Sequence, residues 1–450
     1  MSRKVIVIGS GAAGLRAAST IREKGDAHIT VFTEEEHIAY SPCAIPFVIE
    51  GKIKDFHSII MHTPEFYAKE RNIAVRTKTK VAAVDLDKKE VSLADGTKHS
   101  YDALVLAAGG TVFIPPVPGS TLKGVYPIRW IADRMAVQQA MKGAKHAVVA
   151  GAGVIGLEMA HALKVAGLDV TVVEMFKQVI PRIVDPDMAA MVQSKMEAEG
   201  IRFLMGAPIA GLKGDGKVEA VTVGATDIPA DIVIMATGIR ANLELPTQMG
   251  LDLSPLGAVR VSPTLQPYKK GRILTDVFLA GDLITCESAV AGGPTMSQLG
   301  SAAVRQGRVA GINAAGGYAT YPPVIGPWVS VVGGLEVGGC GLSRGLADYY
   351  GLKTVETVAE GWSRARYYPG GGKLSVKLIA DVETHRLLGA QLVGTEGITG
   401  RVNWISAALL ASATIEEFVC NYENAYCPPT SMVKDVVNVA ADKLAAQLSR

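Results

Sequence analysis

Two glycine-rich loops constrain the fold of this chain more than any other feature. The first, Gly9-Ser10-Gly11-Ala12-Ala13-Gly14, follows an apolar strand pattern at 5–8; the second, Gly151-Ala152-Gly153-Val154-Ile155-Gly156, follows one at 146–150. In each, the first glycine permits a tight turn, the second lets the main chain approach a pyrophosphate, and the third lets helix pack on strand. One such loop is a weak signal. Two loops, each between a strand and a helix pattern, predict two β-α-β units that bind two dinucleotides side by side.

An acidic residue at the end of the second strand of each unit would bind the ribose hydroxyls of its dinucleotide. In the first unit Thr33 takes the expected register and Glu34 comes next, so Glu34 is the predicted ribose ligand. The alternative is a solvated carboxylate in the acidic run 34–36. In the second unit Glu174 closes the strand, and no cation follows it directly. A carboxylate there would repel a 2′-phosphate, which favours NADH over NADPH.

A cysteine stands in the loop that leaves the second strand of the first unit. Cys43 lies in the stretch Ile38-Ala39-Tyr40-Ser41-Pro42-Cys43-Ala44-Ile45-Pro46-Phe47, which we expect to start a further helix. A thiol there would lie near the cofactor, and the helix N-terminus would favour its thiolate and lower its pKa. The alternative is a buried structural cysteine, the usual fate of a free thiol.

Length, charge and cysteine content narrow the class of protein. A chain of 450 residues predicts two or three domains. The net charge of +2 is too balanced to indicate nucleic acid or an acidic membrane surface as a partner. We see no apolar run that would span a bilayer and no room for a signal peptide before the first strand, so we expect a cytoplasmic protein. The five cysteines are odd in number and mostly far apart, which argues against a disulfide framework, and we predict no metal site.

Later segments repeat the strand-to-glycine pattern. Buried strand patterns end at Ala108-Gly109-Gly110, at Thr237-Gly238 and at Gly281-Asp282, and the carboxylate of Asp282 suits a hydrogen bond to a sugar or ribityl hydroxyl. Residues 59–107 are predicted to hold an inserted antiparallel piece with short strands at 74–76, 81–85 and 90–93. From about residue 321 the pattern changes to strands followed by helices.

Over essentially its whole length the chain resembles the FAD- and NAD(P)H-dependent pyridine nucleotide–disulfide oxidoreductases. The matching residues are Gly9, Gly11 and Gly14, Cys43 with Ile45 and Pro46, Gly151, Gly153 and Gly156 with Glu158, the run 275–282, and Tyr426-Cys427-Pro428-Pro429. No second cysteine follows Cys43 at CxxxxC or CxxC spacing. The chain therefore looks like the single-cysteine branch, which contains coenzyme A disulfide reductase, NADH oxidase, NADH peroxidase and NAD(P)H per- or polysulfide reductases. Ala12 and Ala13 stand where the peroxidases place a histidine, which weakens that alternative.

This resemblance implies an α/β fold with two Rossmann-like domains, for FAD and NAD(P)H, and a C-terminal α+β dimerisation domain. The expected domains are residues 1–112 and 239–320 for FAD, 113–238 for NAD(P)H and 321–450 for the interface of a homodimer. Cofactor contacts are expected, beyond the two glycine loops, from Glu34, Ser41, Pro42, Val81, Ala108, Gly109, Glu158, Glu174, Gly238, Gly281 and Asp282.

The resemblance also implies a reaction. Electrons from NADH would pass through FAD to Cys43, whose thiolate attacks a disulfide, persulfide or polysulfide of a small molecule, coenzyme A being one that fits. Arg22, Lys69 and Arg71 are candidate ligands of its phosphates, or else ordinary surface charges. Tyr426 and Tyr367 or Tyr368 match family tyrosines that reach the active site of the partner subunit, where they would protonate the leaving thiolate. Cys427 is either a second redox sulfur or a buried packing residue.

Three other functions fit the same motifs. The first is an NADH oxidase that reduces oxygen. The second is an electron-transfer reductase for a small iron–sulfur protein, which needs no catalytic cysteine. The third is a redox sensor without turnover.

Overall fold

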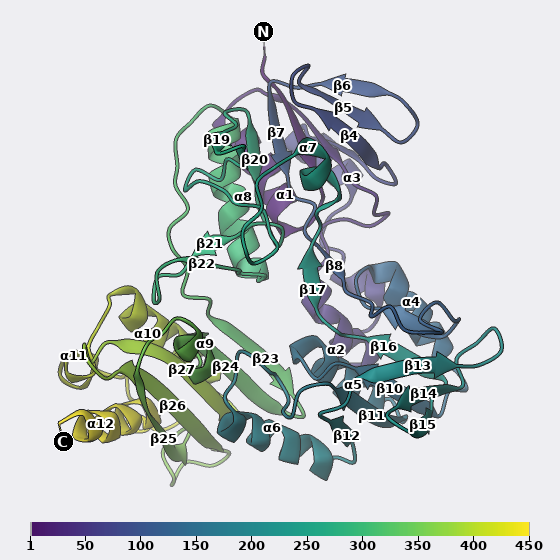
Figure 1. The fold of residues 1–450 in the computed structure, drawn as a ribbon. Helices are drawn as coiled ribbons and strands as arrows, with labels where there is room; N and C mark the ends of the chain where they lie inside the picture. The colour runs from purple at the N-terminus through teal and green to yellow at the C-terminus, as the bar shows by residue number, and fades with distance from the viewer. Residues whose placement is uncertain (1, 450) are drawn as a thin grey trace.

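The first sheet is assembled from two separate segments of the chain. The computed structural model describes residues 2–449, and Figure 1 shows three lobes, with this sheet in the upper one. Its order is β20-β7-β1-β2-β3, and all its strand pairs are parallel. The strands are β1 (Lys4–Ile8), β2 (His28–Phe32), β3 (Ala74–Arg76), β7 (Ala103–Leu106) and β20 (Val277–Leu279). Because β20 lies far along the chain, the upper lobe closes only after the next lobe is complete.

Two helices from the two segments pack closely against each other in the upper lobe. They are α1 (Ala12–Lys24), which opens at the first glycine loop, and α8 (Gly300–Ala314). A Cβ on Gly307 would lie 2.3 Å from the carbonyl oxygen of Ala13, and one on Gly311 would lie 2.7 Å from that of Ala17. These distances leave no room for any side chain, so glycine is what brings α8 against α1 and the loop before it.

The prediction that residues 74–76 join an antiparallel insertion is wrong. β3 pairs in parallel with β2, with Val75 opposite Val31, because α3 (Pro64–Arg71) returns the chain to the same end of the sheet. The antiparallel insertion is smaller and has a third strand that the sequence did not reveal. It consists of β4 (Val81–Asp85), β5 (Glu90–Leu93) and β6 (Lys98–Ser100).

The second lobe, at the lower right of Figure 1, repeats the parallel architecture around the second glycine loop. Its main sheet has the order β12-β11-β10-β16-β9, and an antiparallel sheet, β13-β14-β15, lies beside it. The main strands are β9 (Val125–Pro127), β10 (His146–Ala150), β11 (Asp169–Glu174), β12 (Arg202–Met205) and β16 (Ile232–Met235). The others are β13 (Ile209–Lys213), β14 (Ala220–Val223) and β15 (Thr226–Pro229), and the helices are α4 (Ile131–Ala140), α5 (Val154–Val165) and α6 (Pro186–Ala198).

A two-stranded ribbon carries the chain into and out of the second lobe. β8 (Gly110–Val112) pairs antiparallel with β17 (Ile239–Ala241), and the guanidinium carbon of Arg240 lies 3.5 Å from the ring centroid of Phe113. After the ribbon the chain returns to the upper lobe. There it forms α7 (Glu244–Met249) and the pairs β18 (Tyr268–Lys269) with β19 (Arg272–Ile273) and β21 (Cys286–Glu287) with β22 (Pro294–Thr295).

The third lobe is an antiparallel sheet covered by helices. Its order is β23-β24-β27-β26-β25, with α10 and α12 packed on it. The strands are β23 (Trp328–Val332), β24 (Leu335–Gly341), β25 (Thr354–Trp362), β26 (Lys373–Asp381) and β27 (Leu387–Gly394). The helices are α9 (Arg344–Tyr349), α10 (Ile398–Leu410), α11 (Ile415–Asn421) and α12 (Val436–Leu448).

The short helix after Cys43 packs into the second lobe and not on the sheet of its own lobe. A 3-10 turn at Pro42–Ala44 leads into α2 (Ile45–Ile49), and another 3-10 turn follows at Phe56–Ile59. Ile45 and Val48 of α2 are buried in one apolar cluster with Leu157 of α5, and Figure 1 shows α2 beside α5. This packing places Cys43 at the junction of the two lobes.

Membrane-crossing helices and metal-ligand clusters are both absent from residues 2–449. None of the helices there has the length and apolar content needed to cross a bilayer. Likewise, no three His, Cys, Asp or Glu residues in that range lie together as potential ligands of one metal ion.

The close contact of α8 with α1 leads to a prediction about the free energy of unfolding. Gly307→Ala is expected to lower the free energy of unfolding by about 1–3 kcal/mol, because its Cβ meets the α1 main chain. Gly300→Ala in the same helix is the matched control, since nothing lies within 4 Å of its Cβ, and it should be neutral or slightly stabilising. Urea unfolding of the FAD-loaded proteins measures both, and equal effects would contradict the packing described.

Candidate active site

The two glycine loops have the same geometry. The amide of Gly9 donates to the Phe32 carbonyl and that of Gly151 to the Val173 carbonyl, each at 2.8 Å. Gly11 and Gly153 are the N-caps of α1 and α5, and a Cβ on either would have no heavy atom within 4 Å. The space beside each helix N-terminus is therefore open at this glycine and suits the pyrophosphate of a dinucleotide.

The second strands of the two units end differently. The Glu174 carboxylate is buried and accepts hydrogen bonds from the amides of Ala152, at 2.7 Å, and Phe176, at 2.9 Å. The residue equivalent to Glu174 in the first unit is Thr33, whose Oγ1 accepts a hydrogen bond of 2.9 Å from the Ser10 hydroxyl. Glu34, one residue on, is exposed. Its role as a ribose ligand stays a prediction.

Asp282 lies at the carboxyl edge of the first sheet beside an arginine that the sequence analysis missed. Burial raises the pKa of the Asp282 carboxyl, and Arg129 opposes this. The Arg129 guanidinium lies against Gly109, since a Cβ there would be 2.7 Å from its Nη2. Its Nε is buried without a hydrogen-bond partner among the residues described. Arg129 therefore faces both segments of the upper lobe, and a buried Nε–H without an acceptor there fits an anionic or carbonyl-bearing cofactor. A lone arginine in the short connection between β9 and α4 gives no periodic signal in the sequence.

The remaining expected cofactor contacts line these edges. Ser41 and Pro42 are exposed in the turn before Cys43, while Val81 is buried in β4. Ala108 and Gly109 are half-buried just after β7, whereas Gly238, after β16, is exposed. The amide of Gly281 donates to Gln306 Oε1 at 2.7 Å.

The Cys43 thiol is solvent-accessible and is surrounded by charged groups from both lobes. Burial by the surrounding chain raises its pKa, and the carboxylates of Glu158 and Asp282 raise it further, whereas Arg134 lowers it. The net direction is therefore opposite to the predicted lowering, although a main-chain hydrogen bond at Cys43 itself lowers the thiol pKa and acts in the predicted direction. Cys43 lies in a single 3-10 turn before a five-residue helix, and so short a helix has little macrodipole.

Glu158 ties the second glycine helix to the third lobe. Its Oε1 accepts a hydrogen bond of 2.6 Å from the hydroxyl of Ser330, on β23. Burial raises the pKa of the Glu158 carboxyl, and the Ser330 bond opposes this. Glu158 thus stands between Cys43 and the third lobe.

A half-buried pair of a carboxyl and a phenol, Glu35 and Tyr40, precedes the thiol in the chain and was not anticipated. The Tyr40 hydroxyl donates to Glu35 Oε2, and burial raises the pKa of Glu35 to about 7. The acidic run 34–36 suggested solvated side chains, so the sequence carried no sign of this pair. Its cause is the turn that brings Tyr40 back against Glu35.

The tyrosines predicted for the partner's site lie together on the third lobe. The hydroxyls of Tyr367 and Tyr426 are 2.9 Å apart, and this bond raises the pKa of Tyr426. Both side chains are exposed, and so is that of Tyr368. The structure thus brings two of the three predicted tyrosines into one exposed pair.

The structure gives Arg22 a different role from the phosphate contact that the resemblance suggested. Its guanidinium donates to four main-chain carbonyls, those of Arg71, Gly25, Ala27 and Asn72, which ties α1 to α3. Four of its five N–H groups are therefore occupied. Lys69 and Arg71 are exposed in the last turn of α3 and remain candidates.

The other four cysteines are divided between the core and the surface. Cys286 and Cys340 are buried, which raises the pKa of each thiol to about 12. Cys420 and Cys427 are exposed. The prediction of Cys427 as a buried packing residue is therefore wrong.

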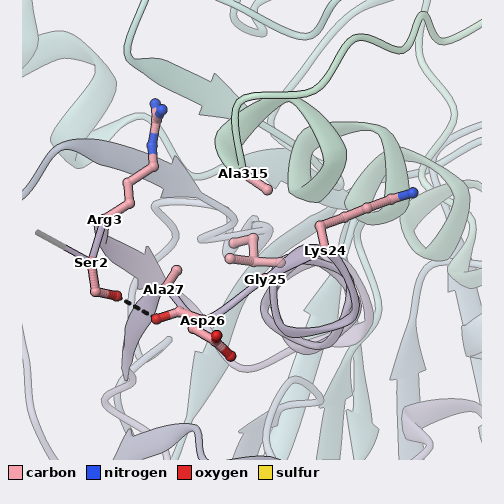
Figure 2. Close-up of a pocket in the computed structure, with 8 residues that line it drawn as sticks. Ser2, Arg3, Lys24, Gly25, Asp26, Ala27 and Ala315 are labelled. Atoms are coloured by element: carbon pink, nitrogen blue, oxygen red, sulfur yellow. Dashed lines mark hydrogen bonds between the residues drawn. The ribbon is translucent and has the colours of Figure 1, made fainter.

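A surface hollow lies at the opposite end of the first sheet. It is lined by Ser2, Arg3, Ile21, Lys24, Gly25, Asp26, Ala27 and Ala315, and Figure 2 shows the Ser2 hydroxyl bonded to the Asp26 carbonyl there. It lies at the start of β1 and the end of α1. Ligands of such sheets bind at the carboxyl ends of the strands, so this hollow is not part of the site.

The fold and the site together define an NAD(P)H-dependent flavoprotein oxidoreductase with an accessible thiol. Residues 3–307 match the family described as pyridine nucleotide-disulphide oxidoreductase, and residues 328–435 match its dimerisation domain. The chain belongs to this family, whose cofactors are FAD and NAD(P)H.

Similar proteins differ in the reaction that their names give. An NADH oxidase of Methanocaldococcus jannaschii is 44% identical over 453 residues, covering 99% of each chain. An NAD(P)H coenzyme A polysulfide/persulfide reductase of Pyrococcus horikoshii is 32% identical over 98% of each chain. The solved structure of an NAD-dependent persulfide reductase from A. fulgidus has a TM-score of 0.95 at 30% identity, covering 99% of this chain and 84% of that one. These names leave the electron acceptor open.

The raised pKa of Glu35 predicts a pH dependence of stability. The folded state holds this proton up to a pH of about 7 and the unfolded chain only to about 4.5. The group therefore stabilises the fold below the lower value, and its contribution is lost as the pH rises through the higher one. Between about pH 5 and about pH 8 the thermal midpoint of the wild type should fall more than that of Glu35→Gln, which cannot ionise.

The control for this experiment is Glu36→Gln. Glu36 is exposed and paired with Lys78 at 2.9 Å. Its midpoint should follow that of the wild type over the same range of pH. Parallel curves for the wild type and Glu35→Gln would show that Glu35 ionises normally.

Proposed function

We propose that this protein passes electrons from NADH through FAD to Cys43, which reduces a low-molecular-weight disulfide, persulfide or polysulfide. The observation that carries this proposal is the position of the thiol. Cys43 is accessible, and the two carboxylates that act on it, Asp282 and Glu158, belong to the FAD and NAD motifs respectively. A thiol at this junction is placed to exchange electrons with both cofactors.

In this proposal some residues bind the cofactors, and Cys43 reacts with the substrate. The first glycine loop, Arg129 and Asp282 would hold FAD, while the second glycine loop and Glu174 would hold NADH. FAD, when bound, supplies the redox link between a hydride donor and a thiol. The Cys43 thiolate attacks one sulfur of the substrate, a bond to Sγ forms as the S–S bond breaks, and the other sulfur leaves as a thiolate. An electron pair from NADH, with a proton, then releases the bound half as a thiol.

We further propose that the active unit is a homodimer in which each third lobe completes the site of its partner. The exposed Tyr367–Tyr426 pair supports this, because its phenols have a hydroxyl proton to give to a leaving thiolate. The matched dimerisation domain at residues 328–435 includes both tyrosines. Coenzyme A is the substrate carrier we favour, with Lys69 and Arg71 as candidate phosphate ligands. The named function of the P. horikoshii relative supports this choice.

A second candidate function is an NADH oxidase that reduces oxygen. The observation in its favour is the relative of that name, 44% identical over 99% of both chains. The two functions differ in the electron acceptor. A screen of acceptors with NADH under anaerobic conditions, followed by the addition of oxygen, separates them.

Loss of the Cys43 sulfur tests the leading proposal. Cys43→Ser should lower the reduction of disulfide or polysulfide by at least about a thousandfold, since the nucleophile is gone. Anaerobic bleaching of the flavin by NADH should persist, because that step does not use the thiol. Cys420→Ser, which removes an exposed thiol elsewhere, is the control and should keep activity. Wild-type disulfide reduction by Cys43→Ser would refute the proposal in favour of an electron-transfer reductase.

The nucleotide preference tests the role of Glu174. The wild type should have a higher kcat/KM with NADH than with NADPH, and Glu174→Gln should narrow that ratio about tenfold by removing one negative charge near the 2′-phosphate. Asp169→Asn, at the exposed start of the same strand, should leave the ratio unchanged. A wild-type preference for NADPH would point to Arg182, whose guanidinium carbon lies 5.4 Å from the ring centroid of Phe176.

A further inference from the structure

Arg134 is a buried cation that lacks a carboxylate partner. It belongs to α4, and only 5% of its surface is exposed. No ion pair joins it to a carboxylate within residues 2–449. Its Nη1 donates to the carbonyl of Pro42 at 3.4 Å, and its Nε is buried without an acceptor among the described residues. A buried guanidinium left in this state is costly, so its retention calls for an anion nearby.

The carboxylates near Arg134 are already engaged. Asp133 Oδ2 accepts from the amides of Arg129, at 3.1 Å, and Trp130, at 2.8 Å. Glu35 is hydrogen-bonded to Tyr40, and since burial raises its pKa to about 7 it carries only part of a charge at neutral pH. The other guanidinium of this region, Arg129, faces Asp282. Burial lowers the pKa of Arg134 and outweighs Tyr40, Asp133 and Cys43, which favour its charge from a distance. Arg134 is therefore left without a carboxylate in direct contact.

The Cys43 sulfur, which would be negatively charged as a thiolate, lies in the same region and has no other cation to pair with it in the part of the chain that the structure describes. Pro42, whose carbonyl Arg134 holds, directly precedes Cys43 in the same 3-10 turn. Burial, Glu158 and Asp282 all disfavour the thiolate and raise the pKa of Cys43. Arg134 is the side chain that favours the thiolate and lowers this pKa. Packing of α2 against α4 and α5 holds this arrangement in place.

We propose that Arg134 is the counter-ion of Cys43, a positioning residue whose guanidinium holds this sulfur as the thiolate. The inference rests on the proposed function of Cys43 as the nucleophile. On ionisation the S–H bond gives its proton to solvent, which reaches Cys43 directly, and the sulfur anion is paired with a cation supplied from the second lobe. The fraction of Cys43 present as the thiolate thus depends on a residue of the second lobe, although the thiol itself belongs to the upper lobe.

The test measures the proton affinity of the thiol itself. The FAD-loaded enzyme, reduced anaerobically with dithiothreitol, is alkylated with iodoacetamide across a range of pH, and modified Cys43 is quantified by peptide mass spectrometry. In Arg134→Met the rate profile should move to higher pH, with alkylation below the wild-type pKa slowed about tenfold. Arg134→Lys, which keeps the charge, should restore most of the rate. Lys142→Met removes an exposed cation just beyond α4 and should match the wild type.

An unchanged profile in Arg134→Met, with FAD content intact, would overturn the inference. If that variant does not fold, Arg134→Gln keeps a polar group of similar length, and the same shift is expected of it. The outcome is independent of turnover. Normal disulfide reduction by Cys43→Ser would refute the proposed function without altering the alkylation profile, whereas a normal profile in both neutral variants would refute only the role of Arg134.

Discussion

The arrangement of the site depends on one packing contact, the burial of α2 in the second lobe. Ile45 and Val48 lie in the same apolar cluster as the glycine helix α5, although their strand neighbours belong to the upper lobe. Burying each such side chain stabilises the protein by about 1.5–3 kcal/mol, so the loop between β2 and α2 is held at both ends by different sheets. Cys43 lies on that bridge. Separation of the lobes would therefore move the thiol away from one of the two nucleotide sites.

The same bridge explains the electrostatics around the thiol. Side chains from three places meet there: Asp282 from the upper lobe, Glu158 from α5, and Arg134 from α4. Two of the three are carboxylates, and burial also opposes charge. Without a cation and a bound cofactor the site would keep Cys43 as a neutral thiol. The proton affinity of this sulfur is therefore set by charges from both lobes as well as by the local turn.

Much of the fold could be predicted from sequence because its signals are local. Each glycine loop stands between a strand and a helix in the sequence, and their spacing alone predicts the two β-α-β units. The prediction failed at β3, because a three-residue strand has no periodicity to show which partner it takes. At the site, Gly11, Gly153 and Glu174 were identified as candidates through motif spacing, and their contacts with the cofactors stay predictions. The Glu35–Tyr40 pair is local, only five residues apart, and was missed because the acidic run 34–36 suggested solvated side chains. Arg129 and Arg134 were missed because their roles come from burial between segments that lie far apart in the chain. The thiol pKa was wrong in direction for the same reason: a helix start can be read locally, but desolvation cannot.

The late arrival of β20 has a consequence for how the chain reaches this fold. During synthesis β7 emerges with one edge unpaired. That edge stays unpaired until the whole second lobe has been made and residues 277–279 of β20 can pair with it. An exposed edge strand of this kind is a template for wrong pairing, and long-range parallel contacts form slowly. The second lobe is continuous between β8 and β17 and meets no such delay. The ribbon of those two strands then brings the ends of the inserted lobe together, so that the returning chain starts close to the edge it must cover.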